Sequence, residues 1–359
     1  MSLMHTSRHP QLLEESVRIL QSLIRIPSVS REETEATDFI FNYLNEQGAS
    51  PQRLHHNVWA CSTHFRADRP TLLLNAHIDT VKPNASWTKL PFKPLLEGQR
   101  LYGLGSNDCG GGLCTLMQVF LFLREQEDLA YNLVYLASAE EEVSGKNGIE
   151  SVLPLLPHID VALVGEPTGM QPAIAEKGLM VLDCTAHGKA GHAARNEGVN
   201  AIYEAINDIE WLRTCRMPQS SALLGEVKMS VTMIEAGQQH NVVPDSCRFV
   251  VDVRSNECYS NTELLEYIST HLKSDVKARS TRLNSSSISP SHPLIETAVS
   301  LGRKPFGSPT LSDQALMPFP SFKMGPGESS RSHTADEFIC INEMAEAIDL
   351  YLRMLRPQA

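Results

Sequence analysis

Three short apolar runs constrain the fold of this chain more than any other feature of its sequence. They are TLLLNA at 71–76, NLVYLAS at 132–138 and DVALVG at 160–165. Their apolar residues are continuous rather than alternating, as is typical of parallel strands buried on both faces. A helix is expected over 111–126, and the strand and helix pair recurs at SFKMG and 342–355. This alternation predicts an α/β domain with a mainly parallel sheet.

Two helices are expected before the first of these strands. Apolar residues recur at helical spacing from Gln11 to Ile26, and Pro27 ends the pattern. A second helix is expected to begin at the sequence SREE, where Ser30 and Glu33 have the spacing of a capping box. We expect it to stop at Gly48, in a C-terminal cap position.

A different pattern separates the two halves of this domain. It reads as a strand near 173–187 and then, in order, a helix near 198–213, strands near 225–235 and 242–254, a helix at 262–273 and a strand at 275–283. This βαββαβ order is the ferredoxin-like plan. We therefore expect a discontinuous catalytic domain at 1–173 and 284–359 and an inserted α+β lid domain at 174–283.

Composition excludes several classes of function. The net charge of −11 and the lack of a Lys/Arg cluster argue against nucleic-acid binding. No apolar run approaches the ~18 residues of a membrane span. The first residues lack the pattern of a secretory signal, so we expect a cytoplasmic protein. The eight cysteines form no CxxC pair, which argues against a zinc knuckle or a disulfide scaffold.

Acidic residues and a histidine follow the expected strands. The segments are HID at 77–79, NDCGG at 107–111, EEE at 140–142 and GEP at 165–167. Alone, each could be a surface turn or a solvated face, and His333 could lie anywhere. However, ligands bind open α/β sheets at the carboxyl ends of the strands, so all four segments can converge there. Buried carboxylates must be paired, protonated or metal-bound, so the order of the segments favours a cation site.

The same segments carry a resemblance to a known family. In order, the chain contains NAHIDTV, GLGSNDCGG, SAEEEVSG, LVGEPTG, GKAGHAA, GVNAI, NVVPD, DVRSN and MGPGESSRSHTADEFI. This series, which runs nearly the full chain, resembles the acetylornithine deacetylase, succinyl-diaminopimelate desuccinylase and carboxypeptidase G family of co-catalytic zinc hydrolases. The resemblance implies a zinc-peptidase-like catalytic domain and two Zn²⁺ ions, with Co²⁺ or Mn²⁺ as substitutes. It implies that His77 and Glu166 hold one ion, that Glu142 and His333 hold the other, and that Asp108 bridges them.

The resemblance also implies roles in catalysis. Glu141 becomes the general base that takes a proton from the attacking water and passes it to the departing nitrogen. Asp79 becomes a second carboxylate that orients the His77 ring, although it could instead be a helix cap. After Asp108, many relatives carry a lysine before glycine, whereas this chain has Cys109 followed by three glycines. Packing and substrate choice near Cys109 are therefore open.

Three residues of the inserted domain match positions that relatives use for substrate. His192 matches a histidine that reaches across a dimer to the partner's active site, so the resemblance implies a homodimer formed through the lid domain. Asn241 and Arg254 match substrate-associated positions, and arginine pairs well with an α-carboxylate. His192 could instead be an ordinary polar residue, and Arg254 could form a structural ion pair.

The leading prediction is a zinc-dependent deacylase of a small N-acyl amino acid, with N-acetylornithine as the first candidate substrate and arginine biosynthesis as its context. The alternatives are N-acetylcitrulline, an N-succinyl form of ornithine, citrulline or diaminopimelate, and a dipeptide. A silent binding protein with the same fold is a further alternative, although every expected ligand and Glu141 are present. A serine hydrolase is disfavoured because the chain has no GxSxG elbow.

Overall fold

The computed structural model describes residues 8–195 and 197–356. Within them the chain divides into two compact units. The first contains the described residues of Met1–Ile174, Ile288–Phe306 and Ser312–Ala359, and the second contains those of Ala175–Ser287 and Gly307–Leu311. The expected division assigned 307–311 to the first unit. A main-chain hydrogen bond of 3.2 Å from Lys177 to Ser308 holds this segment to the second unit instead.

A mainly parallel sheet forms the centre of the first unit, which confirms the expected α/β class. The strand order is β1-β2-β6-β3-β7-β17-β8. Parallel pairing joins β6, β3, β7 and β17, and antiparallel pairing adds β1, β2 and β8 at the sides. The strands are Gln52–Leu54 (β1), Asn57–Cys61 (β2), Thr71–His77 (β3), Asn132–Ser138 (β6), Val161–Pro167 (β7), Ala173–Glu176 (β8) and Ser321–Gly325 (β17).

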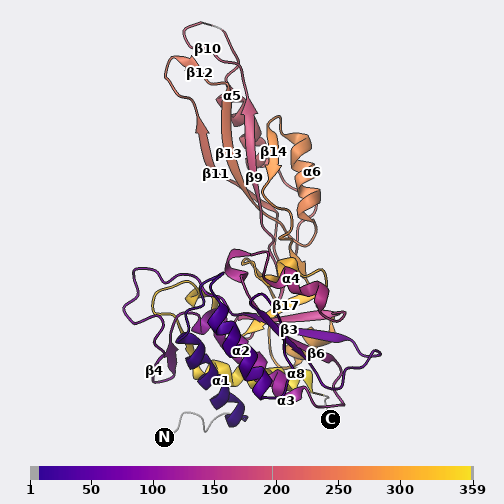
Figure 1. Ribbon diagram of the computed structural model, residues 1–359. Helices are drawn as coiled ribbons and strands as arrows, with labels where there is room; N and C mark the ends of the chain where they lie inside the picture. Colours follow the sequence, from indigo (N-terminus) through magenta and orange to yellow (C-terminus); the bar gives the residue numbers. More distant parts are fainter. Residues whose placement is uncertain (1–7, 196, 357–359) are drawn as a thin grey trace. The chain divides into compact units, whose positions relative to one another are not determined.

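Both faces of this sheet are covered, which explains the continuous apolar runs. In β3, Leu72 and Leu74 belong to the larger hydrophobic core, whereas Leu73 belongs to a smaller core on the other face. The helices of the larger core gather on one side of the sheet (Figure 1). They are α1 (Pro10–Ile24), α2 (Thr34–Glu46), α3 (Gly111–Leu123), α7 (Pro293–Ser300) and α8 (Ile341–Leu355). The short α4 (Ile149–Val152) packs in the smaller core.

The prediction of a capping box at the start of the second helix is wrong. Helix α2 begins at Thr34, and its N-terminal cap, Glu33, makes no side-chain capping hydrogen bond. Instead, the Ser30 hydroxyl donates to Oδ2 of Asp79 at 2.7 Å, and Glu33 accepts from the main-chain N–H of Glu140 at 3.1 Å. The two side chains that the local pattern assigned to a helix cap therefore contact distant parts of the chain instead.

The second unit has the expected βαββαβ order. It comprises β9 (Met180–His187), α5 (Ala201–Thr214), β11 (Lys228–Ala236), β13 (Ser246–Arg254), α6 (Asn261–His271) and β14 (Asp275–Ala278). The sheet order β11-β13-β9-β14 is antiparallel throughout and is that of a ferredoxin-like fold. Its core is formed by one face of the sheet and by α5 and α6. The single strand expected near 173–187 is two strands, β8 and β9.

Several smaller elements complete the two units. In the second, β10 (Gly191–His192) pairs with β12 (Val242–Val243) beyond one end of the sheet (Figure 1). Residues Ser286–Ser287 (β15) pair with β8. In the first, β4 (Leu95–Glu97), β5 (Arg100–Tyr102) and β18 (Phe338–Cys340) form a three-stranded sheet. Strand β16 (Phe306–Ser308) also pairs with β8. None of the helices in the described residues is both long and apolar enough to cross a membrane.

Candidate metal centre

The expected ligands lie where the parallel strands of the first unit end. His77 is the last residue of β3, and Glu166 is near the end of β7. Asp108 lies in the turn Ser106–Gly110 before α3, and Glu142 lies in the turn Glu141–Val143 after β6. His333 follows β17 in the chain, after the short helical turn Ser329–Arg331. The sheet thus brings together at its carboxyl edge side chains that are far apart in sequence.

Asp108 lies between the two histidines. Its Oδ1 is 3.2 Å from Nε2 of His77, and its Oδ2 is 3.6 Å from Nε2 of His333. Glu142 is on the His333 side, with its Oε2 2.8 Å from Nε2 of that ring. Because the two carboxylate oxygens of Asp108 face different imidazoles, this residue has the geometry needed to bridge two cations.

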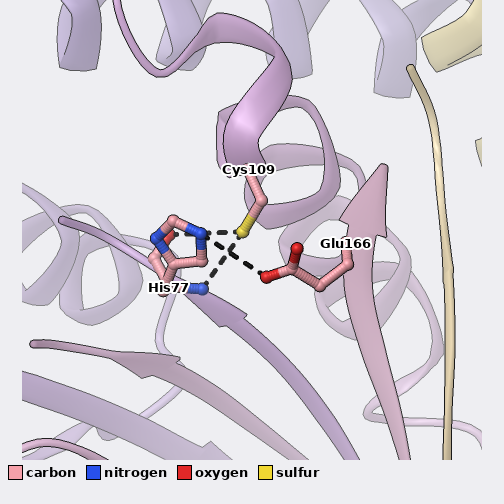
Figure 2. A group of neighbouring side chains, drawn as sticks. All are labelled: His77, Cys109 and Glu166. Carbon is pink, nitrogen blue, oxygen red and sulfur yellow. Dashed lines mark hydrogen bonds and ion pairs between the residues drawn. The ribbon is translucent and has the colours of Figure 1, made fainter. Parts of the chain in front are cut away.

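Glu166 and Cys109 lie on the His77 side (Figure 2). Oε1 of Glu166 is 3.5 Å from Nε2 of His77 and has no hydrogen-bond partner among the described residues, although it is inaccessible to solvent. Burial, and then the nearby Asp108 carboxylate, raises the pKa of Glu166 to about 8. The Cys109 sulfur accepts a hydrogen bond from the main-chain N–H of His77 at 3.2 Å.

The donor set fits a pair of divalent cations. Imidazole nitrogens and carboxylate oxygens are the ligands that zinc and related ions take in hydrolases. Donor atoms of His77, Asp108 and Glu142 lie within 4.8 Å of one another, and so do those of His77, Cys109 and Glu166. Burial also raises the pKa of Glu141 well above its usual range, and the neighbouring Glu166 adds to this effect. Bound cations would neutralise these buried carboxylates, which otherwise take up protons at a higher pH than usual.

Asp79 contacts His77 through both its main chain and its carboxylate. Its main-chain oxygen is hydrogen-bonded to Nδ1 of His77 at 2.8 Å, and its Oδ1 lies 3.6 Å from the same nitrogen, which leaves Nε2 free to bind a metal. The carboxylate also accepts from the main-chain N–H groups of Glu141 at 3.0 Å and Glu142 at 3.2 Å. Asp79 thus orients the ring through its backbone and fixes the turn after β6 through its side chain.

Glu337 is a buried carboxylate of the site that the sequence reasoning missed. It accepts three main-chain hydrogen bonds, from Gly105 at 2.9 Å, Asn107 at 2.8 Å and Asp108 at 2.9 Å. Burial raises its pKa to about 8, although these N–H groups oppose the shift. Glu337 lies within the motif SRSHTADEFI. No spacing rule singles it out, because its partners are more than 200 residues away in sequence.

Glu33 and Glu140 hold the turn that carries Glu141, a role of Glu33 that its local sequence pattern does not indicate. Glu140 has a left-handed backbone, with φ of 55°. Its N–H is held by the buried Glu33, and its own Oε1 accepts from the side-chain amide of Asn147 at 3.1 Å. The other carboxylate oxygen of Glu33 is 2.8 Å from Nδ1 of His56. These contacts keep an unfavourable backbone conformation in place next to the proposed base.

Close packing between α3 and β7 explains why glycine follows Cys109 in this chain. A Cβ atom built on Gly112 would lie 1.8 Å from the main-chain oxygen of Gly165. Only glycine therefore lets the start of α3 approach β7 this closely. Because Asp108 stands four residues before Gly112 and Glu166 directly follows Gly165, the close approach helps to bring the two carboxylates to the same site.

The remaining expected residues belong to the second unit. His192 is exposed, and its Nδ1 accepts from the main-chain N–H of Ala194 at 3.1 Å, so Nε2 is free to donate. Asn241 lies beside it, since its main-chain oxygen accepts from Ala193 at 3.0 Å. Arg254 forms a two-point ion pair with Asp252, at 2.8 and 3.1 Å. Any substrate carboxylate at Arg254 would have to compete with that pair.

The fold and the site together define a metal-dependent hydrolase that acts on amides. Residues 73–356 match the model of Peptidase family M20/M25/M40. The chain belongs to this family.

Named relatives agree with this assignment. The chain is 27% identical to succinyl-diaminopimelate desuccinylase of Corynebacterium glutamicum over 355 residues, covering 93% of this chain and 94% of that protein. Among solved structures, a tripeptidase of Staphylococcus aureus has a TM-score of 0.73 at 19% identity, covering 96% of this chain and 97% of that one. A dinuclear metal-binding peptidase of Bacillus subtilis has a TM-score of 0.72 at 18% identity, with the same coverage. At these identities the two structures support the fold alone.

Proposed function

We propose that the chain is a two-zinc enzyme that removes the N-acyl group from a small amino acid. One observation carries the proposal: the Asp108 carboxylate lies between His77 and His333, with Glu166 and Glu142 at the two sides. His77, Asp108 and Glu166 would hold one zinc ion, and Asp108, Glu142 and His333 would hold the other. When bound, two such ions supply a nucleophile from water at neutral pH and polarise the amide carbonyl.

Glu141 is the proposed general base. Its Oε2 is 4.0 Å from Nε2 of His77, and its main-chain N–H is fixed by Asp79. From there its carboxylate can accept a proton from the attacking water and donate it to the departing amine nitrogen. Burial raises the pKa of Glu141 well above its usual range, and a raised pKa makes the carboxylate a stronger base, which suits the first step of this shuttle.

N-acetylornithine is the first candidate substrate, which would connect the enzyme to arginine biosynthesis. An N-succinyl substrate is the second, and the similarity to the Corynebacterium desuccinylase favours it. N-acetylcitrulline, N-succinylornithine, N-succinylcitrulline and dipeptides complete the set of candidates. All of these substrates have a linear amide next to a carboxylate. Arg254 is proposed to bind that carboxylate.

The second unit is proposed to act as a lid and as the surface of a homodimer. His192 would donate from Nε2 to the oxyanion in a neighbouring subunit, and Asn241 would bind substrate beside it. The free Nε2 of His192 and its position next to Asn241 support this proposal. A monomer in solution that is fully active would contradict it.

A hydrolysis panel tests the proposed function. Zinc-loaded protein is given the N-acetyl and N-succinyl forms of ornithine, citrulline and diaminopimelate, together with several dipeptides, and free amine is measured. One dominant N-acyl amino acid is the expected result. The Glu141→Ala variant should keep its metal and lose turnover. If no substrate is cleaved although two zinc ions are bound, the chain is a silent binding protein and the proposal fails.

A further inference from the structure

Cys109 lies beside the metal centre but has no role in the proposed ligand set. It directly follows Asp108 and is 1% exposed. Its sulfur lies in a group with a ring nitrogen of His77 and a carboxylate oxygen of Glu166, all within 4.8 Å of one another (Figure 2). Apart from this group, its recorded contacts are with the main chain of His77.

The spacing of these atoms suits one tetrahedral ion. Zinc binds thiolate sulfur at ~2.3 Å and imidazole nitrogen at ~2.0–2.1 Å, so two ligand atoms of one ion lie about 3.5 Å apart. The distance from Nε2 of His77 to Oε1 of Glu166 is 3.5 Å. That oxygen is also inaccessible to solvent and has no hydrogen-bond partner in the described part of the chain. An ion bound by these two atoms would therefore lie within reach of the sulfur.

We propose that Cys109 binds, as a thiolate, the ion that His77 and Glu166 hold. This inference rests on the proposed two-metal function and adds a ligand to one of its sites. As the ion binds, the thiol releases its proton to solvent and a metal–sulfur bond forms. The N–H of His77 still donates to the sulfur, because a thiolate remains an acceptor. The consequence is a site that prefers thiophilic ions such as Zn²⁺, Co²⁺ and Cd²⁺ to Mn²⁺ and Mg²⁺.

The competing explanation is that Cys109 is only a packing residue. In that case the thiol stays neutral, with its sulfur between the N–H of His77 and the carbonyl of the same residue at 3.6 Å. Cys114 provides a matched control. It is also a fully buried free cysteine, five positions further along in α3, but it belongs to neither candidate group of metal ligands.

X-ray absorption at the zinc edge distinguishes the two explanations. Wild-type protein loaded with two zinc ions should show a zinc–sulfur shell at ~2.3 Å beside the shorter nitrogen and oxygen shell. The sulfur shell should persist in Cys114→Ser and disappear in Cys109→Ser. Cobalt-loaded protein should show a sulfur-to-cobalt charge-transfer band in the near ultraviolet, which Cys109→Ser abolishes and Cys114→Ser keeps.

Competition between metals gives a second readout. Removal of a residue that supports a metal site lowers metal affinity by at least ~10-fold. Cys109→Ser should therefore bind zinc at least ~10-fold more weakly than the wild type, whereas its affinity for manganese stays unchanged. Two bound zinc ions without a sulfur shell in the wild type would overturn the inference and leave the proposed function intact. Failure of the wild type to bind zinc at all would overturn both.

Discussion

Removal of the Glu337 carboxylate should destabilise the protein and disable its metal centre. In Glu337→Ala, three buried main-chain N–H groups, of Gly105, Asn107 and Asp108, lose their acceptor. Each buried N–H without a partner costs about 1–3 kcal/mol, so the loss in unfolding free energy should be at least about 3 kcal/mol. The turn that presents Asp108 would then shift, and a displacement of about 1 Å near reacting groups can lower kcat about 100-fold.

Glu337→Gln should have a smaller effect, because its amide oxygen can replace Oε1, which accepts from both Asn107 and Asp108. Its amide nitrogen then faces the N–H of Gly105, so one hydrogen bond is lost, at about 1–3 kcal/mol. Unfolding by urea is measured in metal-free protein, in alkaline buffer above the pKa of Glu337. Replacement of the exposed Glu127 by alanine is the control, with an expected change within about 0.5 kcal/mol. If both Glu337 variants were as stable as the control, the cost of burying this carboxylate would outweigh its hydrogen bonds, and the reasoning would be wrong.

Three further predictions concern the metal centre. Glu141→Gln should lower kcat by about 100- to 10,000-fold while both metal ions, counted by elemental analysis, remain bound. Asp108→Ala should lose both ions in the same analysis, whereas Glu142→Ala should keep one. In metal-free protein, the unfolding free energy should fall as the pH rises through about 6 and about 8. Burial raises the pKa of Asp313 and Glu166 to these values in the folded protein, so the folded state binds more protons than the unfolded state in this range. Urea midpoints that stay constant from mildly acidic to mildly alkaline pH would contradict this.

The architecture could be predicted because burial leaves a clear mark on sequence. The runs at 71–76 and 132–138 are apolar without alternation, and in β3 both faces are indeed covered by hydrophobic cores. The βαββαβ order of the second unit was also predicted. The expected single strand near 173–187 was wrong because the main-chain N–H groups of Lys177 and Leu179 donate to the distant Ser308 and Leu283, and this segment separates β8 from β9.

The supporting residues of the site could not be predicted, because their partners are distant in sequence. Ser30 and Glu33 have a local capping pattern, yet their side chains contact Asp79 and Glu140 instead. Glu337 contacts a turn more than 200 residues earlier. A pattern within one segment records which face of an element is buried. It does not record which distant main-chain groups need an acceptor.

Asp79 connects metal binding by His77 with proton transfer by Glu141. Its backbone oxygen sets the tautomer of His77, and its carboxylate holds the amides of Glu141 and Glu142. A small displacement of this residue would therefore change metal affinity and proton transfer together. Attempts to improve one of these properties by mutation near Asp79 should meet a trade-off with the other, so variation in activity is more easily introduced at the substrate side of the site.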